Sequence, residues 1–335
     1  MRCPKRVLVT GGAGFIGSSF VRYGLKEIVW CERVVNLDLL TYAADLRNVQ
    51  ECEADPRYRF VQGDIRDEVL VERLCVEEKI EAIVHFAAES HVDRSILGPR
   101  AFLETNVGGT LALLEVVRRH PHVHFHQIST DEVFGSLGET GVFTEESPYL
   151  PNSPYSASKA AADHFVRAYA HTYGLSTTIS HCTNNYGPGQ NVEKFIPRMI
   201  AGCLHRQPLP IYGRGQNVRD WIFVDDHSDA VWRILERGGR GEVYCIGGEC
   251  ERKNVEVLDE IIQIFARVRR EDVTLLRRLI AHVQDRPGHD MRYAICPRKA
   301  KEQLGWSPKH VFISGLEKTI LWYLEHPDRM SPGLS

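Results

Sequence analysis

The first half of the chain alternates short apolar runs with amphipathic stretches, and this rhythm constrains the fold more than any other feature. Short runs rich in Val and Ile are typical of strands buried on both faces of a sheet. Helical patterns between such strands are typical of crossovers, so the sequence predicts an α/β fold with a doubly wound parallel sheet. The expected strands are Arg6–Thr10, Arg33–Leu37, Tyr58–Gln62, Ala82–Phe86, Phe125–Ser129 and Ser176–Ser180, and the expected helices are Ile16–Lys26, Glu68–Glu77, Phe102–Arg119 and Ser156–Tyr173.

Past about Tyr186 the pattern changes, because Gly and Pro become frequent and the helical patterns become shorter. This change predicts two domains, one over residues 1–186 and a smaller C-terminal lobe over residues 187–330. Segments near residues 218–247 have the character of strands that return to the first domain, so we expect the two parts to be interleaved.

Charge and hydropathy exclude several classes of function. The 335 residues carry 41 basic and 44 acidic side chains, a formal charge of −3, with no basic block, so nucleic acid is not the expected partner. No run of about 18 apolar residues occurs, so we expect no membrane span. The N-terminus leads directly into a short strand and a glycine loop, without the apolar region of a secretory signal.

Cysteine and histidine patterns bear on redox compartment and metals. None of the nine cysteines forms a Cys-x-x-Cys pair, which favours reduced thiols in a cytoplasmic enzyme. His120, His122, His124 and His126 alternate, so a metal cluster on one face of a strand is conceivable. Polar positions on the flank of a strand are the better interpretation, because no closing ligand is evident, and we expect no metal.

A glycine loop follows the first expected strand and opens the first expected helix. The sequence Gly11-Gly12-Ala13-Gly14-Phe15-Ile16-Gly17 fits G-x-G-x-x-G. Glycines let the backbone turn tightly and approach a pyrophosphate, and the helix N-terminus supplies unpaired N–H groups. Asp38 ends the second strand about twenty residues further on, as dinucleotide-binding sheets require. The loop therefore predicts a Rossmann-type sheet that binds a dinucleotide.

Two acidic residues indicate which dinucleotide the loop binds. Asp38 can accept hydrogen bonds from the hydroxyls of an adenosine ribose and would repel a 2′-phosphate, so NAD is favoured over NADP. Asp64, after the third strand, is placed to bind the adenine amino group. Ordinary turn glycines and a helix-capping Asp38 are the alternative, and the strand, helix and spacing argue against it.

Tyr155 and Lys159 stand four residues apart, after the helix-starting Ser153-Pro154, and therefore share a helix face. A phenol beside an ammonium is expected to have a lowered pKa, so Tyr155 could remove a hydroxyl proton while a hydride leaves for nicotinamide. An exposed helix pair is the common alternative for this spacing. With the glycine loop and with Thr130 at the end of a central strand, the chain resembles the extended short-chain dehydrogenase/reductase superfamily.

Asp131 and Glu132 follow Thr130, at the carboxyl end of a strand where such sheets bind ligands. Simple alcohol oxidation needs no pair of carboxyl groups there. A reaction that removes one proton and delivers another does, provided that the environment separates their pKa values. Two solvated acids leaving a strand are the alternative that the local sequence allows.

Six further motifs make the resemblance specific, because the chain from about Arg6 to about Leu324 is similar to nucleotide-sugar 4,6-dehydratases, and most of all to those acting on dTDP-glucose. They are Ala87–Ser95, Asn184–Pro188, Glu193–Pro197, Pro208–Gly213, Arg219–Trp221 and Asp285–Asp290.

The resemblance implies a three-step reaction on one bound NAD, dehydrating dTDP-glucose to dTDP-4-keto-6-deoxyglucose. Tyr155, assisted by Lys159 and Thr130, would deprotonate the C4 hydroxyl while its hydride passes to NAD. Glu132 would act as base at C5 and Asp131 as acid at the C6 hydroxyl, so that water leaves. The hydride then returns to C6 and no external redox partner is needed. Asp131 must be protonated when Glu132 is ionised, as a coupled pair.

The resemblance also implies the two binding sites. The expected NAD-binding residues are Gly11, Gly14, Phe15, Ile16, Gly17, Asp38, Asp64, Ile65, Phe86, Ala87, Ala88, Thr105, Tyr155, Lys159 and Asn185. The expected substrate-binding residues are Ser90, Thr130, Asn184, Lys194, Phe195, Pro210, Tyr212, Arg219, Asn254, Arg286 and His289. Lys194, Arg219 and Arg286 suit a diphosphate, although singly each could be a surface charge. In the family, the helices matching Phe102–Arg119 and Ser156–Tyr173 form a dimer interface, so a homodimer is expected.

Departures from the family pattern leave alternatives open. Phe134 replaces a tyrosine, Leu39 replaces a lysine, and Gly189–Glu193 replaces an aromatic-proline segment. The other hypotheses are a dehydratase of a UDP-hexose, a nucleotide-sugar 4-epimerase or decarboxylase, and a non-catalytic NAD-sensing or scaffold protein. An epimerase would not need Glu132, and a sensor would not need Tyr155.

Overall fold

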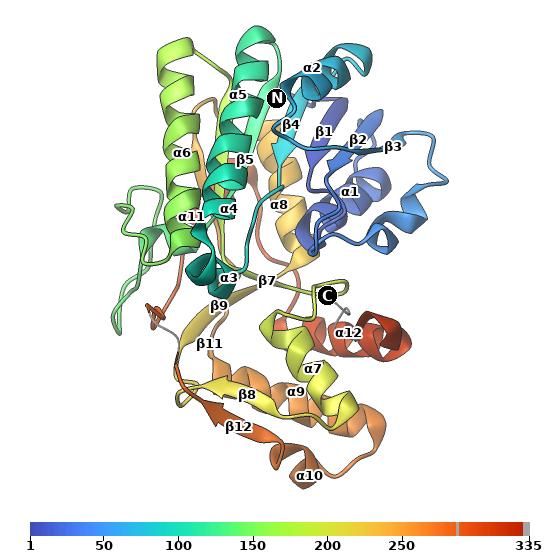
Figure 1. Cartoon of the computed structure of the whole chain (residues 1–335), viewed down its shortest axis with the longest axis vertical. Coiled ribbons are helices and arrows are strands. Elements are labelled where there is room, and N and C mark those ends of the chain that lie inside the picture. Colours follow the sequence, from blue (N-terminus) through green and yellow to red (C-terminus); the bar gives the residue numbers. More distant parts are fainter. Residues whose placement is uncertain (286–287, 331–335) are drawn as a thin grey trace.

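The structure, a computed structural model, describes residues 1–285 and 288–330. Its centre is a seven-stranded sheet in the order β10-β6-β5-β4-β1-β2-β3, with every neighbouring pair parallel (Figure 1). The strand order reverses between β1 and β4, where doubly wound sheets bind their ligands. The strands are β1 Arg6–Thr10, β2 Arg33–Asp38, β3 Tyr58–Gln62, β4 Ala82–His85, β5 His124–Thr130, β6 Thr177–Cys182 and β10 Val243–Ile246.

Helices cover both faces of this sheet, because successive strand residues send apolar side chains to opposite sides. Leu8 and its neighbours pack under α2 (Glu68–Glu77), α5 (Thr110–Arg119) and α6 (Pro154–Tyr173). Val7 and Val9 pack under α1 (Phe15–Glu27) and α8 (Val224–Arg237). The rings of Phe20 and Trp232 stack with centroids 4.5 Å apart and join these last two helices. The predicted α/β fold class is confirmed.

The expected elements of the first half agree closely with the structure, and the strands differ by at most two residues at either end. One expected helix is wrong in detail. Phe102–Arg119 is divided into α4 (Pro99–Phe102), a π-helical segment over Leu103–Gly109 and α5, and the short α3 (Val92–Leu97) precedes them. The adjacent Gly108 and Gly109 have a low propensity for the α-helix, which allows the backbone to depart from it here. Such π-helical turns are frequently found at functional sites.

The later part of the chain forms a second core around Tyr186, Trp221 and Phe265. It contains a three-stranded sheet, β11-β9-β7, and a two-stranded sheet, β12-β8. Its helices are not shorter than those of the first part, contrary to our expectation, since α9 has 16 residues and α1 has 13. The elements of this later part are β7 Asn184–Tyr186, α7 Phe195–His205, β8 Leu209–Tyr212, β9 Val218–Phe223, β11 Glu251–Lys253, α9 Asn254–Arg269, α10 Val273–Arg277, β12 Ile280–Val283, α11 Arg298–Leu304 and α12 Phe312–Glu325, with a 3-10 turn at Pro327–Met330. Two further 3-10 turns, Leu46–Cys52 and Asp131–Phe134, belong to the first part.

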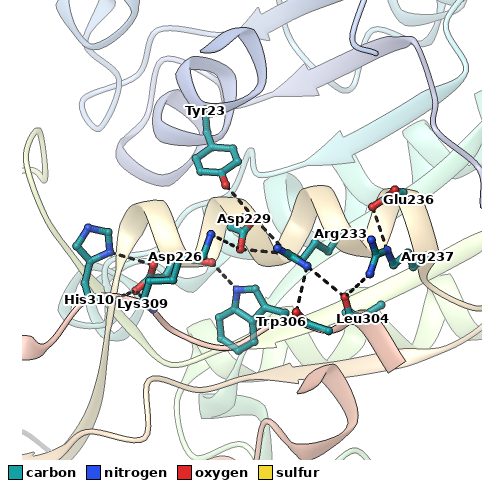
Figure 2. A network of polar contacts seen from close by, with 11 residues as sticks. Tyr23, Asp226, Asp229, Arg233, Glu236, Arg237, Leu304, Trp306, Lys309 and His310 are labelled. Carbon is teal, nitrogen blue, oxygen red and sulfur yellow. Dashed lines mark hydrogen bonds and ion pairs between the residues drawn. The ribbon is translucent and has the colours of Figure 1, made fainter. Parts of the chain in front are cut away.

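The chain crosses between its two parts more than once. Strand β9 lies in the three-stranded sheet, whereas α8 packs on α1 and β10 adds a seventh strand beside β6. Figure 2 shows how α8 holds the segment after α11, because the Asp226 carboxylate accepts the backbone N–H groups of Lys309 and His310. On its other side α8 is tied to α1, because the Tyr23 hydroxyl donates to the carboxylate of Asp229. The division into domains at residue 186 stays a prediction.

Two alternating histidines of the sequence lie inside the fold. His124 and His126 are buried on β5, and their ring nitrogens bind Ser176, Thr178 and Ser180 beside or on β6. Among the described residues no group of three or more His, Cys, Asp or Glu side chains could hold a metal. No helix in the described part of the chain is long and apolar enough to cross a membrane.

Candidate active site

One cavity lies at the carboxyl ends of the central strands, next to the point between β1 and β4 where the strand order reverses. It is lined by the glycine loop, by the ends of β2, β4, β5 and β6, and by Tyr155 and Lys159 of α6. Loop residues from the later part, among them Gln190, Asn191 and Lys194, complete the wall. Segments far apart in the sequence therefore meet in one site.

The glycine loop lies directly against the backbone that follows β4. Gly11 has φ +72°, and a Cβ there would stand 2.6 Å from the nitrogen of Ala87. A Cβ at Gly17 would collide with the carbonyl oxygen of Gly11. Gly14 is the N-cap of α1, and no side chain caps the first turn. The loop thus leads into a helix N-terminus that no side chain caps, the arrangement that suits a pyrophosphate.

Asp38 is buried at the end of β2, as the sequence predicts. Its carboxylate accepts the N–H groups of Ala13 at 2.9 Å and of Leu40 at 2.8 Å, which fixes it beside the glycine loop. Burial raises the pKa of Asp38, although these two hydrogen bonds favour the ionised form. The Asp64 carboxylate instead pairs with Arg66 at 2.6 Å, and this pairing holds the pKa of Asp64 below its usual range.

The first turn of α6 positions Tyr155. Ser153 is the N-cap, and its side chain accepts the N–H of Ser156 while the Ser156 hydroxyl accepts the N–H of Ser153, each at 3.0 Å. Pro154 follows at the first helical position, where its missing N–H costs nothing. Tyr155 and Lys159 are both buried, on the helix face that lines the cavity.

The expected lowering of the Tyr155 pKa by Lys159 is wrong for the protein alone. The Lys159 ammonium donates to the carbonyl oxygen of Ile128 at 2.7 Å, inside the end of β5. Burial and the charge of Glu132 raise the pKa of Tyr155 well above its usual value, and the polar side chain of Thr130 opposes this. Burial also lowers the pKa of Lys159, with Asp163 acting in the other direction.

Asp131 and Glu132 begin the 3-10 turn that leaves β5. Thr130 donates its hydroxyl hydrogen to Asp131 Oδ1 at 3.3 Å and accepts the N–H of Glu132 at 3.3 Å. Asp131 Oδ2 is buried without a hydrogen-bond partner among the described residues. Burial raises the pKa of Asp131 well above its usual range, and the charges of Glu132 and Asp220 add to the effect. A protonated Asp131 beside a second acid is the asymmetry that acid–base chemistry requires.

The structure gathers most of the predicted residues around this cavity. All five expected catalytic residues line it, as do all fifteen expected NAD-binding residues. Of the expected substrate-binding residues, Ser90, Thr130, Asn184 and Lys194 line it, and Arg286 lies outside the described residues. Phe195, Pro210, Tyr212, Arg219, Asn254 and His289 do not belong to its wall.

Two of these remaining residues, Tyr212 and His289, form a second group outside the cavity wall. The Tyr212 hydroxyl contacts the carboxylate of Asp93 at 3.4 Å, and its ring lies 5.8 Å from that of His289. Arg219 is buried on β9, and its charge partly opposes the burial that raises the pKa of Asp131.

Sequence reasoning missed one supporting residue. Asn106, in the π-helical segment, is buried and holds the strand-end loop by accepting the N–H of Glu89 at 2.8 Å and donating to its carbonyl oxygen at 3.0 Å. The same amide donates to Ser158 on α6 at 2.8 Å. Only the neighbouring Thr105 was predicted, because no pattern in the sequence reveals a π-helical turn. Thr183 and Cys182 also line the cavity without having been predicted.

Phe134, the departure from the family tyrosine, is buried in an aromatic cluster rather than in the cavity wall. Its ring lies 5.2 Å from Phe143, 5.4 Å from Tyr149 and 4.8 Å from His181. Tyr149 supplies a hydroxyl in this cluster and contacts His181 at 2.8 Å.

A doubly wound sheet with a glycine loop at its first crossover, and with Tyr155 and Lys159 on the helix after β5, defines the class of extended short-chain dehydrogenases/reductases. The chain belongs to the GDP-mannose 4,6-dehydratase family, whose model matches residues 8–319. A dTDP-glucose 4,6-dehydratase of Xanthomonas campestris is 53% identical over 327 residues, with 95% of this chain and 92% of that protein covered.

Two solved structures extend the comparison. A dTDP-glucose 4,6-dehydratase of Bacillus anthracis, in complex with NAD, superposes with a TM-score of 0.88 at 46% identity, covering 97% of this chain and 98% of the other. The dTDP-glucose 4,6-dehydratase DesIV of Streptomyces venezuelae, with NAD bound, gives a TM-score of 0.90 at 46% identity, covering 96% and 98%.

Proposed function

We propose that this protein is a nucleotide-sugar 4,6-dehydratase that converts dTDP-glucose to dTDP-4-keto-6-deoxyglucose with bound NAD. The observation that carries this function is the pair Asp131 and Glu132 in the same cavity as Tyr155 and Lys159. A 4-epimerase needs only the tyrosine and the lysine, so the pair favours dehydration. The relatives named above, all dTDP-glucose 4,6-dehydratases, support the same substrate.

The glycine loop at Gly11, Gly14 and Gly17 fits NAD, because side chains at Gly11 and Gly17 would collide with neighbouring backbone and distort a loop of the shape that binds a pyrophosphate. Asp38 would hold the adenosine ribose, and Asp64 would lie near the adenine. The rest of the NAD site is proposed to consist of the other expected residues, from Phe15 to Asn185, that line the cavity. When bound, NAD supplies the oxidation at C4 and the matching reduction at C6.

The chain's own residues then move the protons. Tyr155 accepts the proton of the C4 hydroxyl, and the polar side chain of Thr130 favours its ionisation. Because burial opposes this ionisation, the binding of ligands beside the phenol must contribute to it. Glu132 removes the proton at C5, which the ketone at C4 makes acidic. Asp131, protonated because it is buried, delivers a proton to the C6 hydroxyl, so that water leaves.

The nucleotide sugar is proposed to extend from Thr130, Ser90 and Asn184 toward the group around Tyr212. Lys194 donates to the carbonyl oxygen of Ser90 at 2.9 Å, so its charge is held at the edge of the cavity. Arg219 and Lys194 are the cations proposed to bind the diphosphate. Phe195, Pro210, Asn254, Arg286 and His289 complete the proposed substrate site.

We further propose a cytoplasmic homodimer. Apolar side chains stand exposed along the π-helical segment and α6, where Leu103 is 60% exposed, and Phe165 and Tyr173 are also exposed. Pairing this face with a second copy would bury them, and the family resemblance points to the same helices. The nine free cysteines support a reducing compartment.

The function is tested by incubating the purified protein and NAD with a panel of dTDP- and UDP-hexoses and recording mass spectra of the products. We expect a product that is lighter than dTDP-glucose by the mass of one water, about 18 Da, and we expect no NADH to accumulate. A mass-neutral product would favour epimerisation instead. Glu132→Gln separates the two, since turnover that survives this change would argue against dehydration.

A further inference from the structure

The C-terminal 3-10 turn, Pro327–Met330, lies against the 3-10 turn that follows β2, although the two are far apart in the sequence. Met330 is buried in the second core, so the C-terminal turn is fixed to the later part of the chain. The side chain of Arg329, only 11% exposed, reaches across to the first part. Its Nη1 donates to Asp45 Oδ2 at 2.7 Å and to Asn48 Oδ1 at 3.0 Å.

Both partners of Arg329 hold the glycine loop through one carbonyl group. The backbone N–H of Asp45, at 3.0 Å, and the side-chain amide nitrogen of Asn48, at 3.1 Å, donate to the carbonyl oxygen of Ala13. The peptide unit of this carbonyl continues into Gly14, whose N–H donates to the carbonyl oxygen of Gly11 at 3.2 Å. Because Gly14 is the N-cap of α1, these bonds set the direction in which the helix N-terminus faces a pyrophosphate.

Arg329 determines which way the Asn48 amide faces. A guanidinium group can only donate hydrogen bonds, so the amide atom that faces it must be the oxygen, and the amide nitrogen then faces Ala13. The reverse orientation would place the amide oxygen against the carbonyl oxygen of Ala13, and neither atom could donate. Asn48 is 7% exposed, so water has little access to replace a missing partner.

We propose that Arg329 is a positioning residue for NAD, which holds the Asn48 amide in the orientation that fixes the glycine loop. Since the NAD site is part of the proposed function, this role of Arg329 rests on that function. Arg47 offers a contrast on the same carboxylate. It pairs with Asp45 at 2.6 Å and with Asp328 at 2.5 Å, its side chain is 51% exposed, and within the described residues its guanidinium bonds to carboxylates only.

The test measures how fast the NAD-loaded protein releases its cofactor. Protein carrying isotope-labelled NAD is mixed with an excess of unlabelled NAD, and the label that stays bound is followed by filtration. In Arg329→Met we expect release about tenfold faster than in the wild type, the order of effect of a lost hydrogen bond to a charged group. Arg329→Lys keeps a charged donor toward Asn48 and should restore most of the retention. Arg47→Met is the matched control and should release NAD at close to the wild-type rate.

A double-mutant cycle separates an effect through Asn48 from a general loosening of the fold. Asn48→Ala alone should accelerate NAD release by a factor similar to that of Arg329→Met. Adding Arg329→Met to Asn48→Ala should then change the rate little, because the group through which Arg329 acts is already absent. If Arg329→Met fails to fold, Arg329→Ala carries the same cycle, and Asn48→Ala tests the amide without any change at Arg329.

Three results would overturn the proposed role of Arg329. They are release from Arg329→Met or Asn48→Ala as slow as from the wild type, release from Arg47→Met as fast as from Arg329→Met, and a double variant in which the two single effects multiply. Failure of the proposed NAD site would look different, because the wild type would then retain no label on filtration.

Discussion

Buried histidines should make this protein sensitive to acid. His85 binds the hydroxyls of Thr10 at 2.7 Å and Thr110 at 3.2 Å, and His227 binds the Asn185 side chain at 3.0 Å. Burial lowers the pKa of His85, His126 and His227 to about 3 in each case. Each imidazole is therefore neutral in the folded protein at any pH well above 3.

The sign of the effect follows from the unfolded chain, where histidine has a pKa of about 6.5. Below that pH the unfolded chain takes up a proton at each of these histidines and the folded protein does not, so acid favours unfolding. Each histidine lowers the free energy of unfolding by about 1.4 kcal/mol per pH unit between roughly pH 6 and pH 4. Three together give about 4 kcal/mol per pH unit, against a total stability of about 5–15 kcal/mol. Asp131 acts in the opposite direction, because it stays protonated in the folded state.

The perturbation is His126→Gln, which removes one titrating ring from β5 and keeps groups that can hydrogen-bond Thr178 and Ser180. Urea unfolding at pH 7, 6 and 5 gives the free energy of unfolding at each pH. We expect the variant to be less stable than the wild type at pH 7, because a packed ring is lost. Its decline with acid should be shallower by about 1.4 kcal/mol per pH unit.

His122→Gln is the matched control for the exchange, because His122 is exposed in the turn before the same strand. Equal pH slopes for the wild type and His126→Gln would refute the reasoning, whatever the stability at pH 7. So would a wild-type protein whose free energy of unfolding is constant from pH 7 to pH 5.

Three further predictions concern the site and the assembly. Glu132→Gln should lower formation of the 4-keto product by at least about 10²-fold, measured by mass spectrometry, because the base at C5 is lost; unchanged formation would remove Glu132 from the mechanism. Gly17→Ala should weaken NAD binding by about tenfold or more in calorimetric titration, because its Cβ meets the carbonyl of Gly11, whereas Gly138→Ala, with open space around it, should bind normally. Leu103→Glu should shift the protein from dimer to monomer in light scattering, and an unchanged mass would locate the interface elsewhere.

The central sheet could be predicted from the sequence because its signals are local. Buried parallel strands are continuous apolar runs, and the glycine loop and Asp38 follow β1 and β2 at fixed spacings. The start of α6 was equally plain, since Ser153-Pro154 carries the capping signal by itself. For the seventh strand, β10, the sequence predicted only that a segment near residues 218–247 returns to the first domain. The four residues Val243–Ile246 do not indicate that they pair with β6 at the edge of the sheet.

Electrostatics was harder to predict than position. The spacing of Tyr155 and Lys159 places both on one helix face, but it does not show that Lys159 binds the carbonyl of Ile128. Burial, which decides the direction of the Tyr155 pKa, depends on every element around the cavity. For Asp131 the adjacent Glu132 was visible in the sequence, whereas Asp220 reaches it only through the fold.

The contribution of β10 to the central sheet has a consequence for biosynthesis. While the ribosome is still making the middle of the chain, β6 is an uncovered edge, with unpaired backbone groups that could pair with another nascent chain. Residues 243–246 close that edge only after most of the protein has left the ribosome, and α8, which covers one face of the sheet, emerges just before them. Truncations before residue 243 should therefore release aggregation-prone chains rather than a functional cofactor-binding fragment.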